Sequence, residues 1–247
     1  MKQEATISSK QLRKVAPYII NIAMLIGLGT LAFGLVSCGG GGGGGAAGNT
    51  TMTITSIAPP GIVASSVAHT VYIYGTNLPT TGATISITNG SGTPTASIVS
   101  ATANIITAQI TIDTAPTNRY VTLTVQPTTG TSVSSILGVA NVRVLYADIL
   151  NKSYYPQCTG CHGSASTNPV MNLTGNANGL INAGSNCGSK KRVVRGDPRR
   201  ASNVLIDKIQ ATSLSPACAG VPMPMGRTQL QPTEIQDFVE WIAGGAY

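Results

Sequence analysis

Apolar residues follow three different patterns along this chain. A basic start leads into an almost unbroken apolar run over residues 15–36. Residues 51–143 hold short runs rich in Thr, Val, Ile and Tyr, whereas residues 144–247 hold apolar positions at helical spacing. The pattern predicts a targeting segment, then an all-β domain, then an all-α domain, so the expected fold class is multidomain.

The strand-like runs of residues 51–143 predict a two-sheet β-sandwich of immunoglobulin type. Each run is short and is bounded by Pro, Gly or Asn. Residues 83–88 and 121–126 alternate apolar and polar side chains with the period of half-buried strands, and Asn89-Gly90 is a hairpin-turn signal. This segment contains no cysteine, so no disulfide joins the predicted sheets.

Residues 54–78, ITSIAPPGIVASSVAHTVYIYGTNL, and residues 120–130, YVTLTVQPTTG, resemble the opening and closing strands of the IPT/TIG family. The sequence differs from that family at 65–70, SSVAHT, where a glycine is usual. His69 opens a strand here, and we interpret it as a solvated turn residue rather than a metal ligand. No residue pattern in this segment is typical of a catalyst, so the expected role of the domain is spacing, binding of a sugar or a protein, or docking against the second domain.

Residues 1–37 are interpreted as a signal peptide. Four basic residues precede the apolar run, which ends in Leu-Val-Ser and Cys38. This order resembles the bacterial lipoprotein box, in which the cysteine is acylated and becomes the first mature residue. The alternative is an uncleaved transmembrane helix, since about 20 apolar residues span a bilayer.

Residues 38–50 contain seven consecutive glycines after the cysteine and predict a flexible tether. An aspartate directly after the acylated cysteine would resemble an inner-membrane retention signal. Gly39 occupies that position, which favours anchoring in the outer membrane of a Gram-negative bacterium. The domains then lie in the cell envelope, facing the periplasm or the cell surface. Both interpretations of the N-terminus place the rest of the chain in an oxidising compartment.

The segment Cys158-Thr159-Gly160-Cys161-His162 is the candidate for chemistry. It could be half of a zinc site, a redox-active dithiol or the attachment site of a c-type haem. A zinc site calls for a second cysteine pair, and a thioredoxin-like dithiol calls for a preceding strand. Haem attachment needs neither, because two thiols three apart reach the vinyl groups and His162 then reaches the iron.

The 144–247 segment, beyond the haem motif, resembles a group of small bacterial class I cytochromes c. The matching stretches are GDPRRASNVLIDKI at 196–209 and CAGVPMPMGRTQLQPTEIQDFVEWIAGGA at 218–246. The resemblance implies an all-α class I cytochrome c domain with one covalent haem c. A C-terminal helix should begin at Pro232 and pack an apolar stripe on the helix that enters the motif.

Three methionines follow the motif, and no further histidine does. Met171 is close to His162 in sequence and is interpreted as packing at the haem edge. Met223 and Met225 flank Pro224 in a stretch that we expect to be extended, so one of them reaches the iron at a time. The related cytochromes place their distal ligand at Met-Pro, which implies Met223, with Met225 as the alternative.

Cysteine usage then accounts for all five thiols. If Cys38 carries lipid and the motif cysteines carry haem, the remaining pair is Cys187 and Cys218. In an oxidising compartment we expect these two to form a disulfide.

Net charge changes the interpretation little. The chain carries +7, but after Cys38 eleven Lys and Arg face seven Asp and Glu, so nucleic acid is not an implied partner. Six of these eleven basic residues lie in residues 190–200. Such a cluster is typical of a solvated loop, and it could also dock an acidic redox partner or balance haem propionates.

The expected function is single-electron transfer by a lipid-anchored cytochrome, with a redox protein as partner and the membrane reached through Cys38. We do not expect an enzyme, because no acid, base or nucleophile constellation accompanies the motif. Two alternatives remain. The chain could be a surface adhesion or binding protein with an accessory haem, or a haem-based sensor whose sixth iron position is empty.

Overall fold

The computed structural model describes residues 51–163, 173–175, 177–185, 187–210, 214, 218 and 220–247. The predicted signal peptide, Cys38 and the tether lie outside these residues, and so does Met171. Residues Asn49–Tyr247 form one compact unit. Within the described ranges, no helix is both long enough and apolar enough to cross a membrane.

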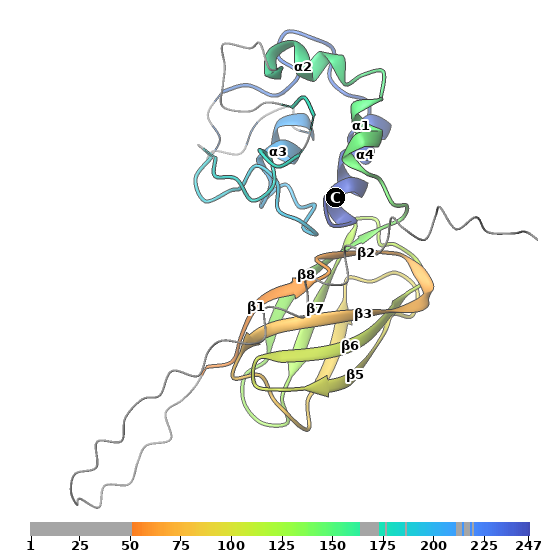
Figure 1. The fold of residues 1–247 in the computed structure, drawn as a ribbon, viewed down its shortest axis with the longest axis vertical. Coiled ribbons are helices and arrows are strands. Elements are labelled where there is room, and N and C mark those ends of the chain that lie inside the picture. Colours follow the sequence, from red (N-terminus) through yellow and green to blue (C-terminus); the bar gives the residue numbers. More distant parts are fainter. Residues whose placement is uncertain are drawn as a thin grey trace, which may run out of the picture. The chain divides into compact units, whose positions relative to one another are not determined.

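Two four-stranded sheets form the first part of the unit (Figure 1). The first sheet has the order β1 (Thr53–Ala58), β3 (Ser65–Thr76), β6 (Ile105–Ile112) and β5 (Thr95–Ala101). The second has the order β2 (Gly61–Val63), β8 (Val133–Ala140), β7 (Tyr120–Gln126) and β4 (Thr84–Thr88). Neighbouring strands are antiparallel except β2 and β8, which are parallel. This is the strand order of an immunoglobulin constant-type sandwich with a split first strand.

Alternation along the strands builds the core of the sandwich. In β7, Val121, Leu123 and Val125 are fully buried, and the side chains between them are only partly covered. Strand β6 shows the same period of two. The two inner faces therefore meet in one continuous apolar cluster.

The predicted hairpin at Asn89-Gly90 is wrong. Asn89 does adopt a left-handed backbone with φ 63°, as the turn signal requires. However, β4 pairs with β7 and β5 pairs with β6, so the turn carries the chain from one sheet to the other. Local turn chemistry sets the bend, whereas the choice of strand partner depends on the packing of both sheets.

The predicted all-α class I cytochrome c domain is also wrong. The chain is mostly β, and the described part of residues 144–247 holds four short helices. They are α1 (Tyr146–Leu150), α2 (Pro156–His162), α3 (Val204–Gln210) and α4 (Pro232–Ala243). The helix that we expected to enter the motif continuously stops at Leu150 and resumes at Pro156.

Composition explains why the described residues between α2 and α3 form no regular helix. This stretch is rich in Gly, Asn and Ser, which favour turns over helix. Asn182, Gly188 and Gly196 adopt positive φ, which no regular helix contains. Isolated β-bridges join Ile181 to Val193, and Lys191 to Asn203, so these loops form hydrogen bonds with one another instead.

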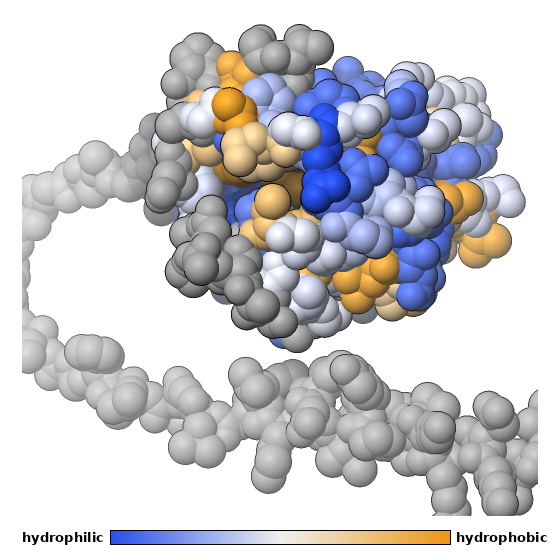
Figure 2. Space-filling model, turned by 90° about the horizontal axis from the view of Figure 1, so that it is seen from above, coloured by the Kyte–Doolittle hydropathy of each residue, from blue (hydrophilic) through white to orange (hydrophobic). Residues whose placement is uncertain are grey.

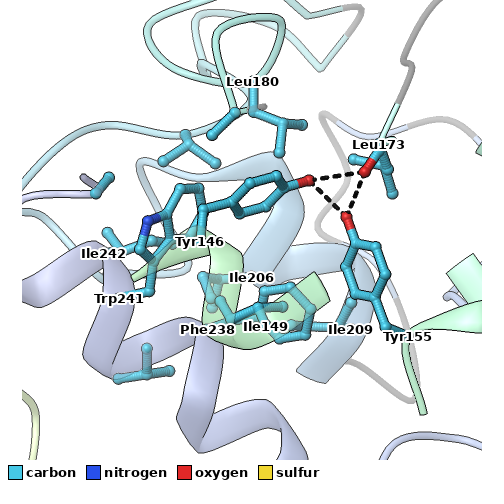
Figure 3. Packing of buried hydrophobic residues seen from close by; sticks show 14 of the residues in the cluster. Tyr146, Ile149, Tyr155, Leu173, Leu180, Ile206, Ile209, Phe238, Trp241 and Ile242 are labelled. Carbon is cyan, nitrogen blue, oxygen red and sulfur yellow. Dashed lines mark hydrogen bonds between the residues drawn. The ribbon is translucent and has the colours of Figure 1, made fainter. Parts of the chain in front are cut away.

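Helix α4 forms largely as the sequence predicts. Pro232 occupies its first turn, and the Glu234 carboxylate accepts a hydrogen bond of 2.7 Å from the Gln231 N–H, which serves where a capping hydroxyl is missing. Its apolar face packs on the segment leading into α2. The rings of Trp241 and Tyr146 lie 5.1 Å apart between centroids (Figure 3).

The C-terminal end of α4 packs closely against the backbone of the sandwich. A Cβ placed on Gly61 would lie 1.9 Å from the Ala243 carbonyl oxygen, and one on Gly138 would lie 2.3 Å from the same oxygen. A Cβ placed on Gly196 would lie 1.7 Å from the Pro60 carbonyl oxygen. Only glycine allows these three backbone segments to approach so closely.

A buried carboxylate strengthens the same contact. Glu240 on α4 is 5% exposed and accepts hydrogen bonds of 2.6 Å from the Arg119 Nε and 2.6 Å from the Asn141 N–H. The Gln236 side chain donates a third, at 2.9 Å. Arg119 precedes β7 and Asn141 follows β8, and these two antiparallel strands meet at the same end of the sandwich, so one carboxylate joins the helix to both strands there.

We predict that Gly138→Ala lowers the free energy of unfolding by about 3 kcal/mol, because the added methyl group must displace backbone atoms. Gly179→Ala is the matched control, since a Cβ there meets nothing within 4 Å. Urea denaturation of both variants measures the difference. Equal stability of the two variants would show that the contact is not tightly packed.

Candidate functional site

Helix α2 places the three residues of the motif on one face. Cys158, Cys161 and His162 are at positions i, i+3 and i+4 of a short helix, and such positions are neighbours on the helix surface. That face borders a cavity of about 450 Å³, which all three residues line. The spacing that the sequence analysis singled out is therefore also a spatial cluster.

The cavity is lined mainly by apolar side chains from segments far apart in the sequence. Helix α3 contributes Val204, Leu205 and Ile209, and the stretch before α4 contributes Leu230. Met223 and Met225 line it as well. The view from above shows apolar residues gathered beside strongly hydrophilic ones (Figure 2). An apolar cavity with few polar groups is the usual form of a cofactor site.

His162 is the candidate proximal ligand, and it is half-buried. Its Nδ1 is buried and has no hydrogen-bond partner in the structure. Its carbonyl oxygen accepts a hydrogen bond of 2.7 Å from the Leu173 N–H. A buried polar atom without a partner is rare in a protein interior, so a ring in this state indicates a site that a ligand completes.

Two tyrosines hold the segment beside α2. The hydroxyls of Tyr146 and Tyr155 lie 2.5 Å apart, and the Leu173 carbonyl oxygen lies 3.2 Å from the first and 2.7 Å from the second (Figure 3). Each hydroxyl has one proton to donate, so these three oxygens share two hydrogen bonds at a time. Burial raises the pKa of both hydroxyls, so they remain donors at neutral pH. Leu173 lines the cavity, and the tyrosines thus keep one wall in place.

Sequence reasoning missed the role of these tyrosines. Tyr155 directly precedes α2, and nothing in its spacing distinguishes it from its neighbour Tyr154, which instead donates to Asp237 at 3.0 Å. The only available signal was that two adjacent aromatic residues come just before the motif.

The Cys158 thiol does not resemble that of a catalytic dithiol. Burial raises the pKa of the Cys158 thiol to about 11, whereas redox-active thiols have a lowered pKa. A zinc site is not favoured either, because no group of three or more His, Cys, Asp or Glu side chains suited to a metal occurs in the described part of the chain. The donor set present here, two thiols and an imidazole beside an apolar cavity, fits haem attachment.

The basic cluster at 190–200 is more than a solvated loop. Asp207 on α3 is fully buried and forms salt bridges with Lys190, at 2.7 Å, and with Arg200, at 2.5 Å. Arg192 lines the cavity and donates to the Gly179 carbonyl at 2.8 Å. Lys208 lines the cavity too, and burial lowers the pKa of its amine. Two cations therefore border the site that the haem would occupy.

Met223 and Met225 differ in their surroundings. Met223 is half-buried, packs against the helical core, and donates its N–H to the Lys208 carbonyl at 2.8 Å. Met225 is 61% exposed. The backbone of Met223 is thus anchored to α3, which makes it the better placed of the two sulfurs for a fixed role in the cavity.

Cys187 and Cys218 are joined by a disulfide, the pairing that the cysteine count predicts. Cys187 lines the cavity, and both residues are buried. Cys218 lies five residues before Met223, so the bridge ties the methionine segment to the opposite loop. His69, by contrast, is a half-buried residue within β3 rather than a solvated turn residue, and its Nε2 has no partner.

Comparison of the chain with models of protein families, with curated proteins and with solved structures finds no match. The resemblances to the IPT/TIG family, to the lipoprotein box and to the haem-binding motif of cytochromes c therefore stay predictions.

We predict that replacing both Cys187 and Cys218 by Ser lowers the free energy of unfolding by about 3 to 4 kcal/mol, because the bridge spans 31 residues and closes a loop of the unfolded chain. Urea denaturation gives the value. The control is wild-type protein treated with reductant, which should approach the variant. Peptide mapping without reduction tests the pairing directly, and a free thiol at either position would contradict it.

Proposed function

We propose that this protein is a c-type cytochrome that transfers single electrons through one haem bound covalently to Cys158 and Cys161. The observation that carries the proposal is the cavity that brings together the motif of α2, His162 and Met223. The haem would be held by α2 and by the loops around it rather than by an all-α domain. A lipid anchor at Cys38 and a redox protein as partner belong to the same proposal.

Each residue of the site would have a distinct role. The two cysteines would attach the group, and His162 and Met223 would be the side chains that hold its iron. Arg192 and Lys208 supply positive charge at the cavity, which favours an anionic edge of the ligand. When bound, such a haem supplies a reversible one-electron iron couple, and a histidine and methionine ligand pair raises its potential.

The apolar wall has a physical purpose in this proposal. Leu173, Leu205 and Ile209 would exclude water from the iron, which leaves little solvent to reorganise when the charge changes. Met223 lines the same cavity as His162 and offers a second protein ligand. This supports electron transfer over a sensor with an open iron position.

We predict that the purified protein holds one haem per chain and that acid–acetone does not extract it. Cys158→Ala combined with Cys161→Ala should lose the covalent haem, as measured by the alkaline pyridine spectrum and by the mass of the intact chain. Gly179→Ala, at a position that does not line the cavity and where a Cβ meets nothing within 4 Å, is the control and should keep it. Extraction of the colour from the wild type would refute the proposal.

We predict that Met223→Ala abolishes the weak sulfur-to-iron absorption of the oxidised protein and lowers the reduction potential, because a thioether ligand is lost. Met225→Ala is the matched control and should keep both. A redox titration with optical spectra measures each variant. Retention of the absorption in Met223→Ala with its loss in Met225→Ala would move the assignment, and retention in both would point to another sixth ligand.

A further inference from the structure

A second cleft lies apart from the cavity beside α2. It measures about 810 Å³ and is formed where strands β1, β7 and β8 border residues 194–199. No residue lines both this cleft and the cavity beside α2, within the part of the chain that is described. Five hydroxyl side chains line it, namely those of Thr55, Ser56, Thr122, Ser134 and Ser135.

The charged side chains of the cleft are Arg195, Asp197 and Arg199. Arg199 donates two hydrogen bonds of 2.7 Å each to Asp197, one to either carboxylate oxygen. Burial alone would raise the pKa of Asp197, but these bonds outweigh it and lower that pKa. Arg199 and Asp197 therefore neutralise each other.

Arg195 keeps an uncompensated charge. It is half-buried, and its guanidinium makes no salt bridge or hydrogen bond with the described part of the chain. Its Nε is buried without an acceptor, and its Cζ lies 5.5 Å from the centre of the Tyr247 ring. A guanidinium held beside an aromatic ring has lost much of its side-chain freedom and keeps its planar set of donors for a flat anion. The cleft thus carries a net charge of +1.

The hydroxyls of the cleft are also available. Those of Thr55, Ser56 and Ser135 make no hydrogen bond with the described part of the chain. Each can donate one hydrogen bond and accept others. A ligand that matches this wall carries several hydroxyl groups of its own, together with one negative charge for Arg195.

The cleft is built on rigid parts of the molecule. Its lining includes Pro60, whose carbonyl oxygen meets the backbone of Gly196 in the contact between the sandwich and the loops. Asn182 adds an amide to the lining. The site is therefore already formed and needs little ordering before a ligand binds.

We propose that this cleft binds a sugar acid, that is, a sugar unit bearing one carboxylate, with the carboxylate on Arg195 and the sugar hydroxyls on the Ser and Thr wall. This activity is independent of the haem. The sugar acid could be free or part of a polysaccharide, and the chemistry that the cleft recognises is the same in both cases.

Calorimetry with the full-length purified protein tests the proposal, with D-glucuronate, a uronate hexamer, D-glucose and inorganic phosphate as probes. We expect glucuronate to bind with a dissociation constant on the order of 1 mM. Glucose should bind about tenfold more weakly, because it lacks the charge-assisted hydrogen bonds. Tighter binding of the hexamer would identify a polysaccharide as the source, and equal binding would identify the free sugar.

The Arg195→Gln variant should bind glucuronate about tenfold more weakly with an unchanged melting temperature. Lys191→Gln is the matched control, since it removes the same charge from an exposed side chain that does not line the cleft. Three results would overturn the proposal: no glucuronate binding by the wild type at 50-fold above the expected constant (roughly 50 mM), equal weakening in both variants, or tighter binding of phosphate than of glucuronate.

Discussion

The rest of the structure depends on the hydrogen bonds that the buried Glu240 carboxylate accepts. It accepts hydrogen bonds from Arg119, from the Asn141 backbone and from Gln236, so it is fully satisfied although it is 5% exposed. Removing one partner of a buried pair typically costs about 3 to 5 kcal/mol, because a charge is left without compensation. Helix α4 is therefore held firmly against the ends of β7 and β8.

From α4 the support passes to the site in a few steps. Trp241 is fully buried, donates to the Tyr247 carbonyl at 3.0 Å and packs on Tyr146. Tyr146 in turn shares the Leu173 carbonyl with Tyr155. Since Leu173 lines the cavity and its N–H bonds to His162, the sandwich stabilises the motif through one continuous series of contacts. The sandwich is thus structural support for the site.

The cavity beside α2 and the cleft beside β1 and β8 differ in the chemistry that they offer. The one beside α2 is mainly apolar and holds thiols, an imidazole and thioethers, which suit a large planar cofactor. The one beside β1 and β8 holds hydroxyls and an uncompensated guanidinium, which suit a small polar anion. If both proposals hold, the protein combines a redox group with a site that recognises an acidic sugar in the cell envelope.

Patterns with local causes were predictable from the sequence. Alternation of side chains produced the strands, since the period of two depends only on the pleat, and Pro232 marked the start of α4 because its φ suits the first helical turn. The motif spacing likewise predicted that Cys158, Cys161 and His162 lie together, and the count of cysteines predicted the Cys187–Cys218 pair. Patterns of this kind can be read from neighbouring residues alone.

Only the tertiary structure decided the rest. Residues 177–203 form bridged loops rather than helices, because their glycines and asparagines favour turns and their hydrogen bonds come from distant segments. The Asn89-Gly90 turn joins different sheets, because the strands on either side of it pair with distant strands rather than with each other. Arg195 packs on the ring of Tyr247, which is more than 40 residues away in the sequence. Met223 donates its N–H to Lys208, which is more than 13 residues away. Both residues therefore acquire their distinct surroundings from distant segments of the chain. The sequence by itself determined which chemical groups are present and where local elements begin, and long-range packing determined which of those groups meet.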